Sequence, residues 1–167
     1  MTDDMSGVPR DGAQFDELDA GRRFLLLSQV AVRHEGRALQ SLSLSYRQMR
    51  TLRHVHSGMT SATELGRVFG VTAPAISETV EALVKRSLLE RAPNERDRRT
   101  VKLVLTTLGK EMVEEGERIR IQVAEELLSP LSDVQRGAFE EILEVLYYPA
   151  YNSLINQRVQ GGDDGAP

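Results

Sequence analysis

The chain has 167 residues, 40% of them hydrophobic, which is enough for one compact domain with or without dimerisation arms. It contains no cysteine, which excludes disulfides, thiolate metal sites and a thiol redox switch. Aromatic residues make up only 5% and tryptophan is absent, which argues against a surface that stacks the bases of a single strand. The N-terminus is acidic and polar, and no apolar run approaches the roughly 20 residues of a membrane span. We therefore expect a cytoplasmic protein that does not contact a membrane.

The charge of the chain is unevenly distributed. The net charge is −4, yet residues 85–102 include seven basic and three acidic side chains, a net charge of +4 for that segment. A basic segment on an acidic body suits a polyanionic partner, because the distribution of charge matters more than its sum. A hairpin whose charges are merely solvated would have the same composition.

The N-terminal part is predicted to be helical after a disordered tail at residues 1–13. Apolar residues recur at helical spacing from Phe15 to about Gln40, within an N-terminal dimerisation segment that we assign to residues 14–43. A second helix begins at Ser45, where Gln48 completes a capping box, and Gly58 is expected to end it.

Two shorter helices follow with the spacing of a helix-turn-helix. Ser61 and Glu64 form a capping box at the start of the third helix, and Gly70 suits a left-handed residue at its end. Thr72 is expected to cap the fourth helix, and Pro74 falls in its first turn. One apolar stripe of this helix consists of Ile76, Val80, Leu83 and Val84.

The periodicity then changes to that of a strand. Apolar side chains lie at every second position, at Val101, Leu103 and Leu105, which predicts a strand with one buried face. Residues 88–92 are its expected partner, and residues 93–97 have the composition of a turn. A helix that can enter a major groove, followed by an arginine-tipped hairpin, is typical of a winged helix. We therefore assign residues 44–106 to a winged helix-turn-helix DNA-binding domain.

Residues 107–158 are predicted to form C-terminal dimerisation helices. The first continues from Thr107 to about Pro130, and the second begins at a capping box of Ser132 and Gln135. Pro149 is expected to kink or end this last helix. Residues 159–167 are expected to form a disordered tail.

The order of elements and the motifs resemble the multiple-antibiotic-resistance regulator (MarR) family of winged-helix regulators. The resemblance is strongest over residues 44–109, where residues 83–91 are similar to the family pattern L-x-x-x-G-L-[IV]-x-R. The most specific match is Asp97-Arg98-Arg99 followed by Leu105-Thr106-x-x-Gly109, as in the D-x-R…L-T-x-x-G signature. The implied fold is mainly α with a small β-hairpin wing, a winged helix-turn-helix domain flanked by N- and C-terminal dimerisation helices.

Two positions depart from the family pattern. Ser87 stands where glycine is usual, so it must either accept backbone strain or cap the helix differently. Glu78 stands where a basic or polar residue is frequent on the reading helix. It would either accept a hydrogen bond from a cytosine amino group or be held away from DNA by a nearby arginine.

The resemblance implies a homodimeric, sequence-specific regulator of double-stranded DNA, expected to be a repressor on a pseudo-palindromic operator. Base-reading candidates on the fourth helix are Thr72, Ala73, Ser77 and Glu78. Wing candidates are Arg96, Asp97, Arg98 and Arg99. By analogy with the family, Arg99 would enter the minor groove with Asp97 fixing its direction, although this pair would also serve simply to tie the hairpin together.

Dimerisation and release by a ligand are further expectations. The terminal helices carry more apolar surface than a small winged helix needs, so a symmetric partner or an intrachain bundle must cover it. The predicted dimer-interface residues are Leu18, Leu25, Val134, Phe139, Ile142 and Leu146. The resemblance also implies a small aromatic or lipophilic effector. Tyr46, Met49, Arg53 and His56 are the residues predicted to line its cleft.

Other classes of function are less well supported by the sequence. No nucleophile elbow, phosphate loop or metal-ligand helix motif is present, so we expect no enzyme, no catalytic residue and no cofactor. His54 and His56 are two residues apart and do not share a helix face, so no metal site is predicted, with a metal-responsive regulator kept as an alternative. Glu78 and the acidic body leave open a winged-helix interaction module that does not bind DNA.

Overall fold

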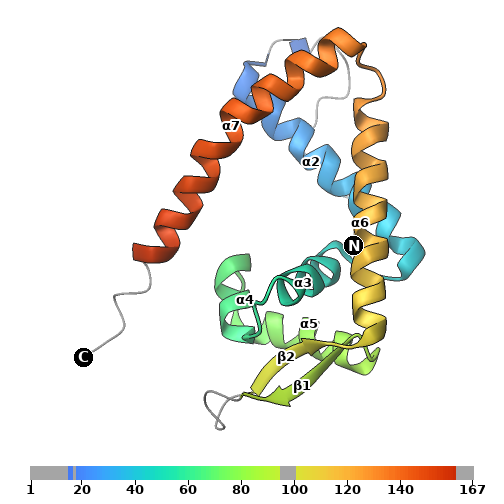
Figure 1. Cartoon of the computed structure of the whole chain (residues 1–167), viewed down its shortest axis with the longest axis vertical. Coiled ribbons are helices and arrows are strands. Elements are labelled where there is room, and N and C mark those ends of the chain that lie inside the picture. The colour runs from blue at the N-terminus through green and yellow to red at the C-terminus, as the bar shows by residue number, and fades with distance from the viewer. Residues whose placement is uncertain (1–14, 17, 95–100, 161–167) are drawn as a thin grey trace. The chain divides into compact units, whose positions relative to one another are not determined.

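The computed structural model describes residues 15–16, 18–94 and 101–160, with backbone alone for residues 153–160. Helices and a single described hairpin follow in the order α2 Ala20–Ala38, η1 Leu39–Leu42, α3 Tyr46–His56, α4 Ala62–Phe69, α5 Ala73–Lys85, β1 Leu89–Pro93, β2 Val101–Leu105, α6 Thr107–Leu128 and α7 Asp133–Gln160 (Figure 1). The chain divides into two compact units, Met1–Ala124 and Glu125–Pro167. The fold is mainly α with a small wing, as the sequence predicts.

The predicted N-terminal helix is divided into two elements. The side chain of Asp19 accepts a hydrogen bond from the backbone N–H of Arg22 at 2.9 Å and caps α2. At its other end α2 passes into the 3₁₀ turn η1, which ends at Ser43 in the left-handed region, at φ 54°. The helix is therefore shorter than the apolar periodicity indicates, because a stripe of apolar residues does not distinguish an α-helical turn from a 3₁₀ turn.

The starts of the next three helices lie where the sequence predicts them. Ser45 and Gln48 form both hydrogen bonds of the capping box at the start of α3. The Ser61 hydroxyl accepts from the backbone N–H of Glu64 at 3.5 Å. Thr72 occupies the N-cap of α5, but its side chain makes no capping hydrogen bond.

The hairpin is a two-stranded antiparallel sheet in which Leu89 pairs with Leu105 and Pro93 with Val101. The predicted buried face is confirmed for Leu103 and Leu105. Val101, which pairs with Pro93 at the end of the ladder, is 59% exposed. The backbone N–H of Leu103 also donates to the carbonyl of Thr60 at 2.8 Å, which fixes β2 to the segment that precedes α4.

The hydrophobic core of Met1–Ala124 lies between α3, α4, α5 and the hairpin. Figure 1 shows these helices next to β1 and β2. The residues buried to 1% exposure or less include Leu39, Met49, Leu52, Leu65, Ile76, Val80, Leu83 and Leu89. At roughly 1.5–3 kcal/mol for each fully buried aliphatic side chain, this cluster is the main favourable term that holds α5 in place.

The first turn of α6 is fixed to the end of α5 by the L-T-x-x-G segment. The Thr106 hydroxyl donates to the carbonyl of Ser87 at 2.6 Å and accepts from the backbone N–H of Gly109 at 2.9 Å. A Cβ added at Gly109 would clash with the carbonyl oxygen of Leu88. The glycine is therefore needed for the close approach of two backbones, and the threonine caps the helix.

Ser132 caps the last helix, α7, and its backbone N–H donates to the Gln135 side chain at 3.0 Å, as the capping box predicts. Of the two outcomes expected at Pro149, a kink or an end of the helix, the end does not occur, because α7 continues through Pro149 to Gln160. The predicted tail from residue 159 accordingly begins inside the helix. In the part of the chain that the structure describes, none of the helices combines the length and hydropathy needed to span a bilayer.

Candidate nucleic-acid interface

A tight turn joins α4 to α5. Gly70 adopts φ 62°, and the backbone N–H of Val71 donates to the carbonyl of Gly66 at 3.0 Å across the turn. Gly66 is buried, with Ile76 and the carbonyl of Val71 3.5 Å from the position that a Cβ would occupy. The two helices therefore pack as a rigid helix-turn-helix.

The N-terminal half of α5 presents a polar exposed face. All four predicted base readers, Thr72, Ala73, Ser77 and Glu78, are exposed. The opposite face of α5 carries Ile76, Val80 and Leu83, which are buried in the core. Among the residues that the structure describes, none forms an ion pair with Glu78, so an arginine that holds Glu78 away is not found there.

A small cavity of about 260 Å³ lies between the first turns of α4 and α5. It is lined by Ala62, Thr63, Gly66, Arg67, Val71, Ala73, Ile76 and Ser77. Two of the predicted readers, Ala73 and Ser77, are thus brought together with Arg67 of α4, a residue that the sequence motifs do not single out. Arg67 is exposed and supplies a cation beside the reading face.

The predicted wing residues Arg96, Asp97, Arg98 and Arg99 lie outside the described residues. The strands that carry this loop are described, and they bring Arg91 of β1 to the surface. The sheet therefore starts from the end of α5 and leads to the segment that carries the predicted arginines.

The end of α5 shows how the chain accommodates serine in place of glycine. Ser87 adopts φ 56°, so it accepts the left-handed conformation. The preceding residue, Arg86, donates from Nη1 to the carbonyl of Ser43 at 2.6 Å and from Nη2 to the carbonyl of Leu42 at 3.0 Å. Sequence reasoning missed this contact, because it joins residues more than 40 positions apart.

The structure does not gather the four predicted effector residues around one cavity. Met49 is fully buried in the core, so it does not line a cleft in this structure. Arg53 pairs with Glu35 at 2.5 Å and donates to the carbonyl of Gly116 at 2.9 Å, which makes it a link between helices. His56 is exposed, and Tyr46 is the one of the four that lines a described pocket.

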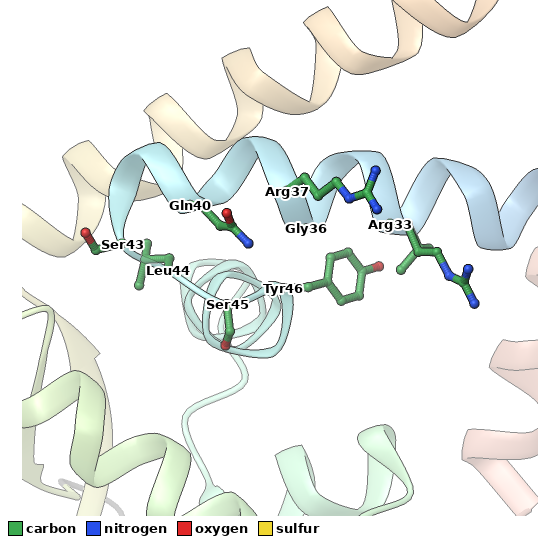
Figure 2. A pocket seen from close by; sticks show the side chains of 9 residues that line it. Arg33, Gly36, Arg37, Gln40, Ser43, Leu44, Ser45 and Tyr46 are labelled. Carbon is green, nitrogen blue, oxygen red and sulfur yellow. The ribbon is translucent and has the colours of Figure 1, made fainter. Parts of the chain in front are cut away.

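That pocket has a volume of about 600 Å³ and lies between α2 and the start of α3. Figure 2 shows the guanidinium groups of Arg33 and Arg37 coming from α2, with the Tyr46 ring directed along α2 toward Arg33. The remaining lining residues are Val32, Gly36, Gln40, Ser43, Leu44 and Ser45. A pocket with an aromatic ring and two cations is suited to a planar organic anion.

The predicted dimer-interface residues are partly on the surface. Leu25, Val134, Ile142 and Leu146 are exposed, whereas Leu18 and Phe139 are half-buried. Across the described ranges, no group of three or more His, Asp or Glu side chains is arranged to hold a metal ion.

Known proteins of one family resemble this chain in sequence and in fold. The model of the MarR family matches residues 42–100. The structure is similar to wild-type MarR from E. coli in its apo form, with a TM-score of 0.72 and 25% identity over 78% of this chain and 97% of that one. A cysteine-to-serine mutant of E. coli MarR in complex with operator DNA gives a TM-score of 0.59 and 25% identity, over 76% of this chain and 92% of that one.

A MarR family protein from Mycobacterium tuberculosis in complex with salicylic acid shares the fold, with a TM-score of 0.64 and 23% identity over 79% of this chain and 98% of that one. Comparison with curated protein sequences gives no match. The family match covers α3, the helix-turn-helix and the first strand of the hairpin, and it ends before the L-T-x-x-G segment at residues 105–109. Residues 42–100 therefore match the MarR family, and the chain shares its fold with E. coli MarR.

Proposed function

We propose that the protein is a homodimeric repressor that binds a pseudo-palindromic operator in double-stranded DNA and is released by a small organic anion. This proposal rests on the two faces of α5, a polar face that is exposed and an opposite apolar face that is buried in the core. The hairpin follows directly after this helix. The complex of E. coli MarR with operator DNA supports duplex DNA as the partner.

In this proposal the first two turns of α5 enter the major groove. Ser77 and Thr72 offer hydroxyl groups to base edges, and the methyl group of Ala73 suits a thymine methyl. Glu78, which has no partner among the described residues, would accept a hydrogen bond from a cytosine amino group. Arg67 beside the reading face would contact a phosphate, which positions the domain without reading sequence.

The wing supplies the remaining contacts. By sequence, Arg96, Arg98 and Arg99 lie in the loop between β1 and β2, where they would reach phosphates or a narrow minor groove. Asp97 would pair with Arg99 and fix the direction of its side chain. Two such domains in a symmetric dimer would read half-sites roughly 34–36 Å apart, centre to centre.

The effector site that we propose is the pocket of Arg33, Arg37 and Tyr46 rather than the cleft predicted around Met49 and Arg53. Two guanidinium groups would bind a carboxylate, and the Tyr46 ring would stack on an aromatic ligand. The effector class remains a small aromatic or lipophilic anion, and the salicylic acid complex of the M. tuberculosis protein makes salicylate a reasonable first probe.

Titration of genomic fragments and of a selected operator duplex at several salt concentrations tests the function. A DNA-binding protein should lose affinity steeply with salt, with a slope of about −0.9 per neutralised phosphate. Replacing Arg98 by alanine should reduce that slope by about 1 for each phosphate that the arginine neutralises. Arg118→Ala, which removes an exposed arginine of α6 paired with Glu115, is the matched control and should leave the slope unchanged. A wild-type protein that ignores duplex DNA at low salt would instead be an interaction module.

A further inference from the structure

Four helix ends in the described part of the chain share one hydrogen-bond pattern. At each end, two backbone N–H groups donate back across a residue in the left-handed region, as in a Schellman motif. The left-handed residues are Ser43 after η1, Gly58 after α3, Gly70 after α4 and Ser87 after α5. Two of these ends therefore use glycine, and two use serine.

The two serine ends are under backbone strain. A residue with a Cβ adopts the left-handed region at an energetic cost that glycine does not have. Strained residues of this kind persist only where their surroundings fix them, and they are frequent in parts of proteins that move. Ser43 and Ser87, at φ 54° and 56°, therefore require an external constraint.

Arg86 connects these two ends, while the Thr106 hydroxyl holds the carbonyl of Ser87. Arg86 immediately precedes Ser87, and its guanidinium donates to the carbonyls of Ser43 and Leu42 at 2.6 and 3.0 Å. These carbonyls lie at the C-terminal end of η1, where backbone acceptors lack partners within the helix. A planar guanidinium can bridge two adjacent acceptors, whereas an ammonium group binds as a single point charge.

The turn that Arg86 holds is also a wall of the pocket. Ser43, Leu44 and Ser45 line the cavity together with Tyr46 and Arg37, as Figure 2 shows. Arg86 is not among the lining residues. It therefore reaches the turn from the end of α5, and its hydrogen bonds join the pocket wall to α5.

We propose that Arg86 is a positioning residue that fixes α5 to the η1–α3 turn, so that displacement of this turn by a pocket occupant changes the orientation of the reading helix. The link to DNA reading rests on the proposed function. The clamp itself is a property of the fold and is tested separately. A ligand acts through this clamp only as far as it binds the two positions of the turn with different affinity.

Three variants of the full chain test the clamp: Arg86→Gln, Arg86→Lys and, as a matched control, Lys85→Gln. Lys85 is the exposed neighbour of Arg86 and carries the same charge. Hydrogen exchange of segments 39–45 and 84–89 is measured first, without DNA. Arg86→Gln should accelerate exchange in both segments, although they are far apart in sequence. Lys85→Gln should leave both unchanged, and Arg86→Lys should give an intermediate result if Arg86→Gln proves too unstable to purify.

Operator affinity is then measured at several salt concentrations. Arg86→Gln should weaken binding roughly twofold to thirtyfold, the range of residues that act on a site without touching its ligand. The slope of log affinity against log salt should stay at the wild-type value. A slope reduced by about 1 would make Arg86 a phosphate contact and overturn the inference. Unchanged exchange in segment 39–45 would overturn it as well. If wild-type protein binds no duplex, the proposed function fails while the exchange experiment still decides whether the clamp exists.

Discussion

Ser87 places a residue with a Cβ in a backbone conformation that glycine adopts more easily. Its φ of 56° follows from the geometry needed to turn the chain from α5 into β1. We expect Ser87→Gly to stabilise the protein by about 0.5–1 kcal/mol, because relief of the left-handed strain exceeds the extra entropy of glycine in the unfolded chain. For a chain of this size, each kcal/mol of added stability raises Tm by about 2–4 °C.

A second serine at a helix end provides the control for this experiment. Ser57 follows α3 at φ −77°, where a side chain causes no strain. Ser57→Gly should therefore leave stability unchanged or lower it slightly. Equal effects of the two substitutions in thermal unfolding would mean that the conformation of Ser87 carries no measurable penalty.

Gly109 is required by a close contact rather than by its own backbone conformation. A Cβ at this position would clash with the carbonyl oxygen of Leu88 and lie 3.1 Å from a methyl carbon of Leu105. We expect Gly109→Ala to lower the free energy of unfolding by about 1–3 kcal/mol, as overpacking of a core does. Gly137→Ala in α7 is the control, because its Cβ would meet no atom within 4 Å and alanine favours helix. A stable Gly109→Ala variant would show that α6 can shift away from Leu88.

At the scale of elements, Arg53 links three helices of Met1–Ala124. From α3 it pairs with Glu35 of α2 at 2.5 Å and donates to the carbonyl of Gly116 in α6 at 2.9 Å. Its Nε is 3.6 Å from a carboxylate oxygen of Glu117. Both members of the Arg53–Glu35 pair have side chains less than one fifth exposed, so the pair is weakly screened by solvent.

Removing one member of this pair should be strongly destabilising. We expect Arg53→Gln to lower stability by about 3 kcal/mol, since Glu35 would keep its burial and lose its partner. Arg118→Gln, which breaks an exposed pair with Glu115, should change stability by less than about 1 kcal/mol. Chemical denaturation measures both. A mild Arg53→Gln variant would make Arg53 an effector candidate again.

The elements that sequence reasoning predicts well are those specified by neighbouring residues. The capping boxes at Ser45 and Ser132 and the left-handed Gly70 depend on contacts within three or four positions. The positions of Met49 and Arg53 depend on packing between distant helices, which a local pattern does not determine. The sequence left a kink or an end open at Pro149, and α7 does not end there, because proline removes one helical hydrogen bond but does not force the helix to stop.

The same distinction applies to the candidate site. The exposed face of α5 follows from the 3.6-residue period of its apolar stripe, and the exposure of all four candidate base readers agrees with that period. The pocket and the contact of Arg86 with the Ser43 turn arise from residues far apart in the chain. The one signal in the sequence is Ser87 in place of glycine, which marks the end of α5 as unusual without indicating what it contacts.

At the scale of the whole molecule, the exposed apolar surface of α7 indicates that another surface covers it. Within residues 133–152, where the structure describes side chains, Val134, Val145 and Tyr148 are among eight large apolar or aromatic side chains of this helix that are exposed. Single exposed apolar residues are normal on a protein surface, but this many on one helix form a larger apolar surface. A second copy of the chain would bury that surface in a symmetric dimer. We therefore predict that the protein sediments as a dimer at micromolar concentration.

A double substitution on α7 tests this prediction together with its consequence for DNA. Ile142→Asp with Leu146→Asp places two charges one helical turn apart on the predicted interface, and burial of unpaired carboxylates should convert the dimer to monomer. The monomer should bind a single half-site as wild type does, but lose the large gain in affinity that two linked half-sites provide. Glu140→Gln on the same helix is the control and should remain dimeric with full operator affinity. A wild-type monomer, or a double variant that still sediments as a dimer, would assign the apolar face of α7 to a contact within the chain.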